Sequence, residues 1–242
     1  MIHSGPECRA VTESARPLAE EIETRGFAIV ERVFRSDEID SITDALARAP
    51  LARSRAGARH AIQDPLVAAL ARHTRLLTMV RSVLGREALP YRATLFNKSP
   101  TSNWLVVWHQ DTALPLCRRE EVPGWGPWSV KSGVTYAHAP AAALNRVLAL
   151  RIHLDDSTPL NGPLRVISGT HRQGVLNDDA VRLLAHQNEP IDCLVGRGGI
   201  LAMRPLLVHA SSKSRTEASR RVLHVEYAAS MAIDRGLELA IA

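Results

Sequence analysis

The segment Trp108-His109-Gln110-Asp111 places an imidazole and a carboxylate two residues apart at the end of a strand-like run. Because side chains alternate between the two faces of a strand, His109 and Asp111 point to the same side. His209, from a distant strand, would complete a two-histidine, one-carboxylate face with open coordination positions, which suits iron(II). An isolated His-x-Asp also fits a surface strand pair or a hydrogen-bonded buried histidine, so further signals are needed.

A second signal is a basic residue that could bind the far carboxylate of a co-substrate. Arg220 lies eleven residues after His209, beyond a serine-rich polar turn. Arginine binds carboxylates through a bidentate fork that lysine cannot reproduce. Arg220 and Arg221 point to opposite faces of an extended run, and we expect Arg220 to point inward and Arg221 to be a solvated surface residue. His224 shares the face of Arg220, and we expect it to contribute to an interior polar network rather than to bind metal.

Several motifs in a fixed order surround these residues. Taken together, they resemble the phytanoyl-CoA dioxygenase family, which includes ectoine hydroxylase and several natural-product hydroxylases and halogenases. The motifs are Gly26-Phe27-Ala28-Ile29-Val30, Asn97-Lys98-Ser99-Pro100, Trp108-His109-Gln110-Asp111, Leu154-Asp155-Asp156-Ser157, Asn161-Gly162-Pro163-Leu164, Ser168-Gly169-Thr170-His171, and His209-Ala210-Ser211 with Arg220.

The resemblance implies a double-stranded β-helix, or jelly-roll barrel, with helices on its outer face. It also implies that His109, Asp111 and His209 bind Fe(II), and that Arg220 pairs with the far carboxylate of 2-oxoglutarate. By the same resemblance, the Ser211 hydroxyl assists Arg220, and Thr94 contacts the co-substrate.

The reaction that the resemblance implies consumes 2-oxoglutarate and O2 and releases succinate and CO2. Halogenating relatives replace the metal-binding carboxylate with a small residue, whereas this sequence keeps Asp111, so we expect hydroxylation or a related oxidation. The expected substrate is a small metabolite or a secondary-metabolite intermediate. An acyl or CoA-type substrate is a further candidate suggested by the family name.

Two other classes of function are compatible with parts of the pattern. Two histidines and a carboxylate also describe catalytic zinc sites of hydrolases, but a hydrolase has no need for the carboxylate-binding Arg220. A barrel of this type could also bind a small ligand without catalysis. Such a barrel would have no chemical need for all three candidate ligands together with the arginine. Metal-dependent consumption of 2-oxoglutarate would separate these alternatives from the oxygenase.

Along the chain, helical patterns come first and short strand-like runs follow. This order predicts an α+β fold with a mainly β core that positions these residues. Helical patterns cover Leu18 to Thr24, Ser36 to Pro50 with Ser36 as N-cap, and Asp64 to Leu84 with Gly85 as C-terminal cap. Strand-like runs are Gly26 to Val30, Tyr91 to Phe96, Trp104 to Trp108, Val147 to Leu154, Leu164 to Ile167, Ile200 to Met203 and Arg221 to Tyr227.

The chain is expected to form one domain with a terminal tail and one long loop. We expect residues 1–15 to be a flexible N-terminal tail and residues 16–242 to form a single dioxygenase domain. The stretch from Leu116 to Leu144 has no sustained period, so we interpret it as a substrate-side loop or lid. Trp125 and Trp128 either bind substrate there or pack the loop onto the barrel. For His153 and His171 we expect ordinary hydrogen-bonded roles.

Composition limits the partners of the chain. The formal net charge of +5 is scattered rather than gathered, and aromatic residues are 4% of the chain, so no nucleic-acid surface is indicated. Mild positive charge favours small anions such as 2-oxoglutarate. The three cysteines form no C-x-x-C pair, and no signal peptide or membrane span is seen. We therefore expect a soluble cytoplasmic monomer or homodimer that acts on a small molecule.

Overall fold

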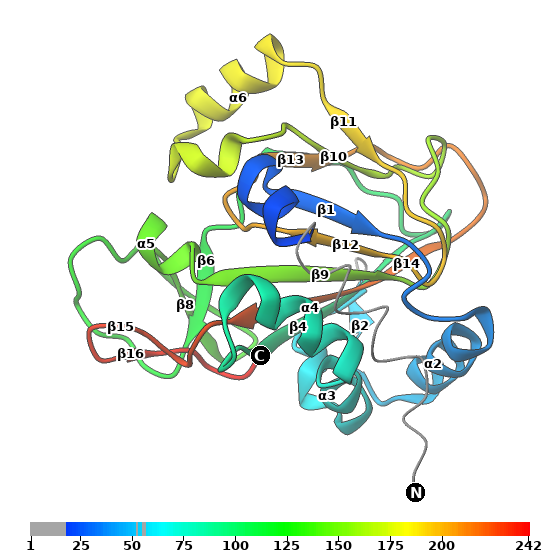
Figure 1. The fold of residues 1–242 in the computed structure, drawn as a ribbon, viewed down its shortest axis with the longest axis horizontal. Coiled ribbons are helices and arrows are strands. Elements are labelled where there is room, and N and C mark those ends of the chain that lie inside the picture. The colour runs from blue at the N-terminus through cyan, green and yellow to red at the C-terminus, as the bar shows by residue number, and fades with distance from the viewer. Residues whose placement is uncertain (1–17, 52, 55–56) are drawn as a thin grey trace, which may run out of the picture.

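The fold is described from a computed structural model that covers residues 18–51, 53–54 and 57–242. The tail expected over residues 1–15 lies outside these residues. Two antiparallel sheets form the centre of the molecule; α2 (Ser36–Arg48), α3 (Pro65–Ala71) and α4 (Thr74–Leu84) lie on the side of the larger sheet, and α6 (Asp178–Gln187) lies on the side of the smaller one (Figure 1). The first three of these helices precede most of the strands in the chain, as the sequence predicts.

The larger sheet has seven strands in the order β1-β12-β9-β14-β4-β3-β2, all paired antiparallel. Its two long central strands are buried along almost their whole length, as expected for strands of a sheet that is covered on both faces. The strands are β1 (Phe27–Val30), β2 (Arg53–Ser54), β3 (Gly57–Ala58), β4 (Leu89–Lys98), β9 (Val147–His153), β12 (Ile200–Met203) and β14 (Arg220–Ala228).

The smaller sheet has four strands in the order β11-β10-β13-β5, again antiparallel. These strands are β5 (Val106–His109), β10 (Leu164–Val166), β11 (Ile191–Cys193) and β13 (His209–Ser211). A buried cluster joins the two sheets: Phe27, Ala149 and Leu201 of the larger sheet pack with Leu164 and Val166 of the smaller one. The sheets therefore face each other across a shared interior, as the two sheets of a jelly roll do.

Helices cover the outer face of the larger sheet. Residues 18–25 are helical, and α2 (Ser36–Arg48), α3 (Pro65–Ala71) and α4 (Thr74–Leu84) follow before β4. Ile39, Val67 and Leu76 from these three helices pack in one buried cluster with Leu150 of β9 and Leu223 of β14. The apolar stripe of each helix thus packs on the outward-pointing apolar residues of the sheet. Burial of these apolar surfaces stabilises the layer.

The helical prediction needs two corrections. The expected helix from Asp64 to Leu84 is two helices, because the chain breaks at Arg72 and His73, and the His73 side chain caps α4 by accepting from the Arg75 backbone N–H. The N-cap of α2 is Arg35 rather than Ser36, and its backbone N–H donates to the Glu38 carboxylate at 2.8 Å. Gly85 ends α4 with φ 93°, as predicted.

The segment expected to be an irregular lid is largely ordered as a hairpin. It contains β7 (Trp128–Lys131) and β8 (Val134–His138), which form a three-stranded sheet with β6 (Ala113–Leu116), and it ends in the short helix α5 (Ala141–Leu144). Trp125 is buried, and its indole N–H donates to Asp234 at 2.9 Å. The packing role considered for Trp125 is therefore the one observed. Two further elements were not predicted from the sequence. One is α6 (Asp178–Gln187), a helix outside the smaller sheet, and the other is the C-terminal hairpin of β15 (Ala232–Asp234) and β16 (Leu237–Glu238).

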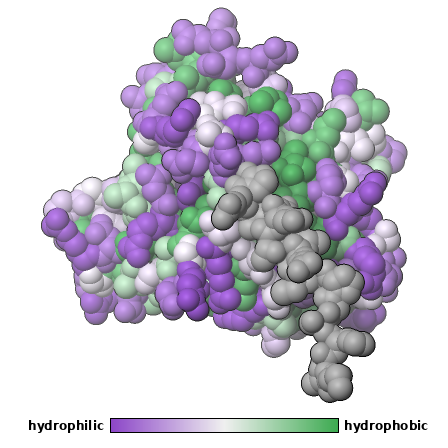
Figure 2. All heavy atoms as spheres, viewed as in Figure 1, coloured by the Kyte–Doolittle hydropathy of each residue, from purple (hydrophilic) through white to green (hydrophobic). Residues whose placement is uncertain are grey.

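The surface is mainly polar on the face seen in Figure 2, where hydrophobic residues gather only in smaller areas. In the part of the chain that the structure describes, no helix combines the length and the apolar character needed to cross a membrane.

Candidate metal centre

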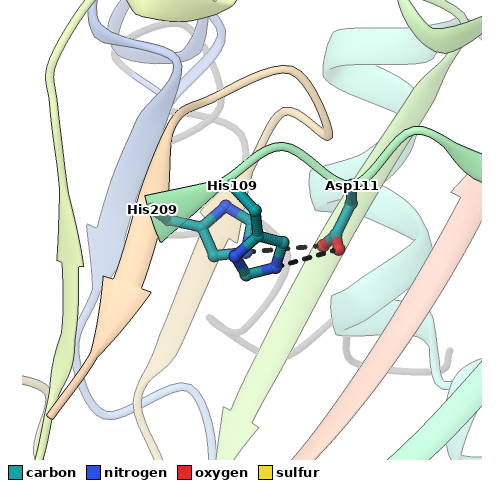
Figure 3. Close-up of side chains that lie close together, drawn as sticks. All are labelled: His109, Asp111 and His209. Carbon is teal, nitrogen blue, oxygen red and sulfur yellow. Dashed lines mark ion pairs between the residues drawn. The ribbon is translucent and has the colours of Figure 1, made fainter. Parts of the chain in front are cut away.

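His109, Asp111 and His209 converge on one point at the edge of the smaller sheet (Figure 3). His109 ends β5, His209 begins β13, and the two residues are paired across these strands. The Nε2 atoms of His109 and His209 lie 3.6 Å from Oδ1 and Oδ2 of Asp111, respectively. One donor atom from each residue lies within 4.8 Å of the other two, and no second group of three such donors gathers within the described residues.

Backbone carbonyl groups fix which nitrogen of each histidine faces this point. The Nδ1 atom of His109 lies 2.8 Å from the Val107 carbonyl oxygen, and that of His209 lies 2.8 Å from the Leu207 carbonyl oxygen. A carbonyl can only accept, so each Nδ1 carries the proton and each Nε2 keeps a lone pair. Two Nε2 lone pairs and a carboxylate aimed at one point fit a divalent transition metal.

Gln110 holds the two neighbouring ligands in place from the opposite side of the chain. Its side-chain amide donates to the carbonyls of Gly174 and Leu206 at 2.9 and 2.7 Å, and its Oε1 accepts from the Leu176 backbone at 2.8 Å. The Asp111 backbone N–H donates to the Pro205 carbonyl at 2.9 Å. The middle residue of the His-Gln-Asp motif thus ties the metal ligands to the turns that precede α6 and β13.

The protonation of the three side chains is set by their contact with one another. Burial lowers the pKa of His209 to about 4, although the Asp111 charge opposes this shift. Partial burial would lower the pKa of His109 as well, but the hydrogen bond and charge of Asp111 outweigh it and raise this pKa. Loss of solvent would raise the pKa of Asp111, yet the neighbouring His209 and His109 hold it well below its usual range. Asp111 is therefore ionised, and His109 is the ligand whose proton competes with a metal.

The three side chains open into a cavity of about 200 Å³ between the two sheets. Residues from both sheets line it, and the larger sheet contributes a row of charged groups. The cavity is lined by Arg92, Thr94, Phe96, Trp104, Val106, His109, Asp111, Arg151, Leu164, His209, Ser211, Arg220, His224 and Glu226.

Arg220 points into the cavity and Arg221 points away from it. Arg220 is 4% exposed, and its Nε donates to the Asn161 carbonyl at 3.3 Å, whereas Arg221 forms a two-pronged pair with Asp155 on the other face. Burial, with the nearby Arg151 charge, lowers the pKa of Arg220 to about 10, so it is cationic at neutral pH. The structure therefore places one arginine, and not its neighbour, opposite the metal ligands.

Ser211 and Thr94, the two residues expected to contact the co-substrate, also line the cavity. The Ser211 hydroxyl donates to the Gly162 carbonyl at 2.9 Å and accepts from the ammonium of Lys98 at 2.8 Å. Its proton is thus already used, and only a lone pair is left for a ligand. Burial, together with Arg220 and Arg151, lowers the pKa of Lys98 to about 8.

Two charged residues of the cavity, Arg92 and Arg151, were not predicted from the sequence, and a third, Glu226, lies on the strand face that strand alternation predicts for Arg220. Arg92 donates to both carboxylate oxygens of Glu226, one of them at 2.6 Å from its Nη2, so this buried pair is neutral. One feature of the sequence could have indicated Arg151: it is a charged residue within the otherwise apolar strand sequence VLALRIH of β9.

The three other histidines considered in the sequence do not join the metal ligands. His224 contacts Arg151, and His171 lies 3.2 Å from the Glu23 carbonyl oxygen. His153 was expected to be hydrogen-bonded, but neither of its ring nitrogens has a partner in the described part of the chain. Burial and the neighbouring Arg151 hold the pKa of His153 well below its usual value, so it is neutral in the barrel interior.

Comparisons with known proteins show what the chain is similar to. A model of the phytanoyl-CoA dioxygenase family matches residues 22–222. The ectoine dioxygenase of Sphingopyxis alaskensis is 30% identical over 110 residues, which are 46% of this chain and 29% of that relative, so the match spans less than a third of its length.

Solved structures share the fold over most of the chain. EctD from S. alaskensis with bound Fe has a TM-score of 0.68 at 22% identity, covering 94% of this chain and 79% of that one. HygX from Streptomyces hygroscopicus, with nickel, 2-oxoglutarate and hygromycin B bound, has a TM-score of 0.64 at 20% identity, covering 88% and 86%. The predicted mainly β core with flanking helices, arranged as a double-stranded β-helix, is confirmed.

Proposed function

The chain belongs to the phytanoyl-CoA dioxygenase family, and from this premise we propose that it is an Fe(II)- and 2-oxoglutarate-dependent dioxygenase that hydroxylates a small organic molecule. One observation carries the proposal. His109, Asp111 and His209 meet at a single point of a cavity that also contains the buried, cationic Arg220. A dicarboxylate that chelates a metal needs two things from its binding site, metal ligands and a group that binds its far carboxylate. This cavity contains both.

In this proposal, each residue has a role that follows from its position. The two Nε2 atoms and the Asp111 carboxylate hold iron(II) from one side, which leaves neighbouring coordination positions for other ligands. When bound there, iron(II) with 2-oxoglutarate would supply O2 activation, and succinate and CO2 would be the products of the co-substrate. Arg220 binds the far carboxylate, where a guanidinium forms a stronger and more directional contact than an ammonium.

Ser211 and Thr94 border the same part of the cavity and are proposed to contact the co-substrate. Ser211 would do so as an acceptor or after releasing Gly162, because its proton is engaged. Lys98 holds Ser211 in position and adds positive charge next to Arg220 below a pH of about 8.

The relatives support the choice of iron chemistry over zinc hydrolysis or ligand storage. Similar structures are described with bound Fe in one case and with 2-oxoglutarate in another. Asp111 occupies the carboxylate position that halogenating relatives lack, which favours hydroxylation as the outcome. The substrate that the proposal requires is a small metabolite, since the cavity of about 200 Å³ is smaller than a typical site for a drug-sized ligand, roughly 300 to 1,000 Å³.

The test is metal-dependent turnover of 2-oxoglutarate by the purified chain. With Fe(II) and air we expect slow release of succinate even without substrate, and none with Zn(II) or under anaerobic conditions. Calorimetry should detect 2-oxoglutarate binding to the Mn(II)-loaded protein but not to the metal-free protein. Absence of 2-oxoglutarate binding to every metal-loaded form would reject the proposed function and favour a hydrolase or a binding barrel.

A further inference from the structure

Arg151 is a buried arginine of the cavity that the proposed metal and co-substrate roles do not use. It lies in the middle of β9 and is 7% exposed. In the sheet it is paired with His224 of β14 on one side and with Leu201 of β12 on the other. Residues that are paired across strands share a face, so Arg151 points into the barrel with them, and it lines the cavity.

The contacts of Arg151 leave its charge without a carboxylate. Its Nη1 lies 3.2 Å from Nδ1 of His224, and its guanidinium carbon lies 5.4 Å from the ring centroid of Phe96. Its Nε is buried without a hydrogen-bond partner, and no carboxylate of the described residues forms an ion pair with it. A buried charge is costly unless it is paired, so this arrangement calls for an anion that binds in the cavity.

His224 orients Arg151 but does not neutralise it. Because a guanidinium can only donate, His224 accepts through Nδ1 and carries its proton on Nε2, which lies 3.9 Å from Glu226. Burial and the Arg151 charge hold the pKa of His224 well below its usual value. Glu226 is itself paired with Arg92. The polar groups around Arg151 are therefore neutral or already matched.

Among the groups that line the cavity, the charges of the proposed complex balance without Arg151. Iron(II) and Arg220 bring three positive charges, which the Asp111 carboxylate and the 2-oxoglutarate dianion offset. Arg92 and Glu226 offset each other. Lys98 does not line the cavity, since its ammonium is bound to Ser211 and to the Ser212 carbonyl. One positive charge, that of Arg151, is left facing the space in which a substrate must lie.

Arg151 also lies at a different level of the barrel from Arg220. Arg220 is four residues from His224 along β14, a span on the order of 13 Å at about 3.3 Å per residue. Arg151 is directly opposite His224. Asp111 is the carboxylate whose charge acts on Arg151 and Asp155 is the one that acts on Arg220, although the charge of Arg151 also reaches Arg220. Arg151 is thus on the metal side of the cavity, and Arg220 marks its far end.

From these contacts we propose that the substrate is a small organic acid whose anionic group is bound by Arg151, beside the metal ligands. This inference rests on the proposed function and specifies its substrate class. It makes Arg151 a specificity-determining residue, because a site built around an unpaired guanidinium rejects a neutral analogue that leaves the charge uncompensated.

The experiment compares butyrate with its neutral analogue butyramide on the protein loaded with Mn(II) and saturating 2-oxoglutarate, without oxygen. Mn(II) speeds the proton relaxation of molecules bound close to it, so NMR reports both binding and proximity. We expect butyrate to relax faster than butyramide on the wild-type chain. In Arg151→Met the apparent affinity for butyrate should fall at least about tenfold, because contacts to charged groups are the strong ones, while 2-oxoglutarate affinity stays within about threefold.

Arg165→Met is the matched control, because Arg165 lies on β10 against Trp108 and does not line the cavity. It should preserve the preference for butyrate. Equal relaxation of butyrate and butyramide on the wild-type chain, a comparison that needs no variant, overturns the inference alone. So does a loss of 2-oxoglutarate affinity in Arg151→Met, which would make Arg151 part of the co-substrate anchor. Failure of the wild-type chain to bind Mn(II) and 2-oxoglutarate overturns the proposed function itself.

Discussion

His109 and His209 lie opposite each other across β5 and β13, with their ring centroids 4.2 Å apart. Each ring is held by a carbonyl two residues earlier in the chain, so both present Nε2 to the same point. The strand pairing therefore preorganises two metal ligands that are one hundred residues apart in the sequence.

Removing either imidazole should abolish the proposed chemistry. His109→Ala and His209→Ala each leave two of the three ligands, so we expect at least about a hundredfold loss of Mn(II) affinity and no detectable succinate release. Calorimetric titration with Mn(II) and a succinate assay measure the two effects. His186→Ala, at an exposed position of α6, is the control and should match the wild-type chain. Normal turnover in either ligand variant would contradict the site.

Gln110 should matter for the metal although it does not face it. Gln110→Leu removes three hydrogen bonds, to Gly174, Leu176 and Leu206, and leaves buried backbone groups without partners. Loss of an outer contact that orients metal ligands typically lowers metal affinity about 10- to 100-fold. Mn(II) titration should show this loss while the far-ultraviolet circular dichroism stays unchanged. Unchanged affinity in a folded variant would mean that the backbone alone positions Asp111.

Arg220→Met should weaken 2-oxoglutarate binding without affecting the metal. A bidentate contact to a carboxylate is lost, and each hydrogen bond to a charged group contributes about 1.5 to 3 kcal/mol, so Kd should rise at least about tenfold. Arg221→Met is the matched control: it removes the adjacent arginine, which pairs with Asp155 away from the cavity. Calorimetry on the Mn(II)-loaded variants measures both. Equal weakening in the two variants would show a general loss of structure rather than a lost anchor.

The sequence predicts the central strands well and the peripheral elements poorly, for physical reasons. β12 matches the prediction at both ends, and β9 is one residue shorter than predicted, because a strand buried on both faces is a continuous apolar run. β7 was missed because it is short and mostly exposed, so pairing with β8 rather than composition defines it. The break between α3 and α4 depends on the His73 cap, which no apolar periodicity reveals.

The candidate site divides in the same way. His109, Asp111 and His209 could be predicted because ligand chemistry limits which residue types can serve, and strand alternation fixes their faces. Arg151 could not, since its significance depends on which charges lack a partner in the folded chain. Whether a buried charge has a partner depends on contacts between strands that are distant in the sequence, and the residue type alone does not reveal those contacts.

Metal affinity should fall as the pH falls, with His109 as the controlling group. The pKa of His109 is raised above its ordinary value of 6.5, that of His209 is lowered to about 4, and that of Asp111 lies well below its usual range. A metal needs the neutral imidazole, so below the His109 pKa each metal ion displaces one proton. Between about pH 6 and 5 we expect roughly a tenfold rise in Kd for Mn(II), measured by calorimetry in two buffers of different ionisation enthalpy. A Kd that is constant over this range, or release of two protons, would contradict the assignment.

Breaking one side of the buried pair of Arg92 and Glu226 should destabilise the fold far more than replacing both sides. Their side chains are 15% and 3% exposed, and Glu226→Leu would leave the Arg92 guanidinium buried without its carboxylate. Breaking one side of a buried ion pair costs about 3 to 5 kcal/mol, whereas replacing both sides with apolar residues is often close to neutral. Urea unfolding should therefore show a large loss for Glu226→Leu and substantial recovery for Arg92→Met combined with Glu226→Leu. Glu121→Leu breaks the exposed pair with Arg119 and should have a far smaller effect, because water screens both charges. If the double variant is no more stable than Glu226→Leu, then the loss comes from the shape of the cavity wall and not from the unpaired charge.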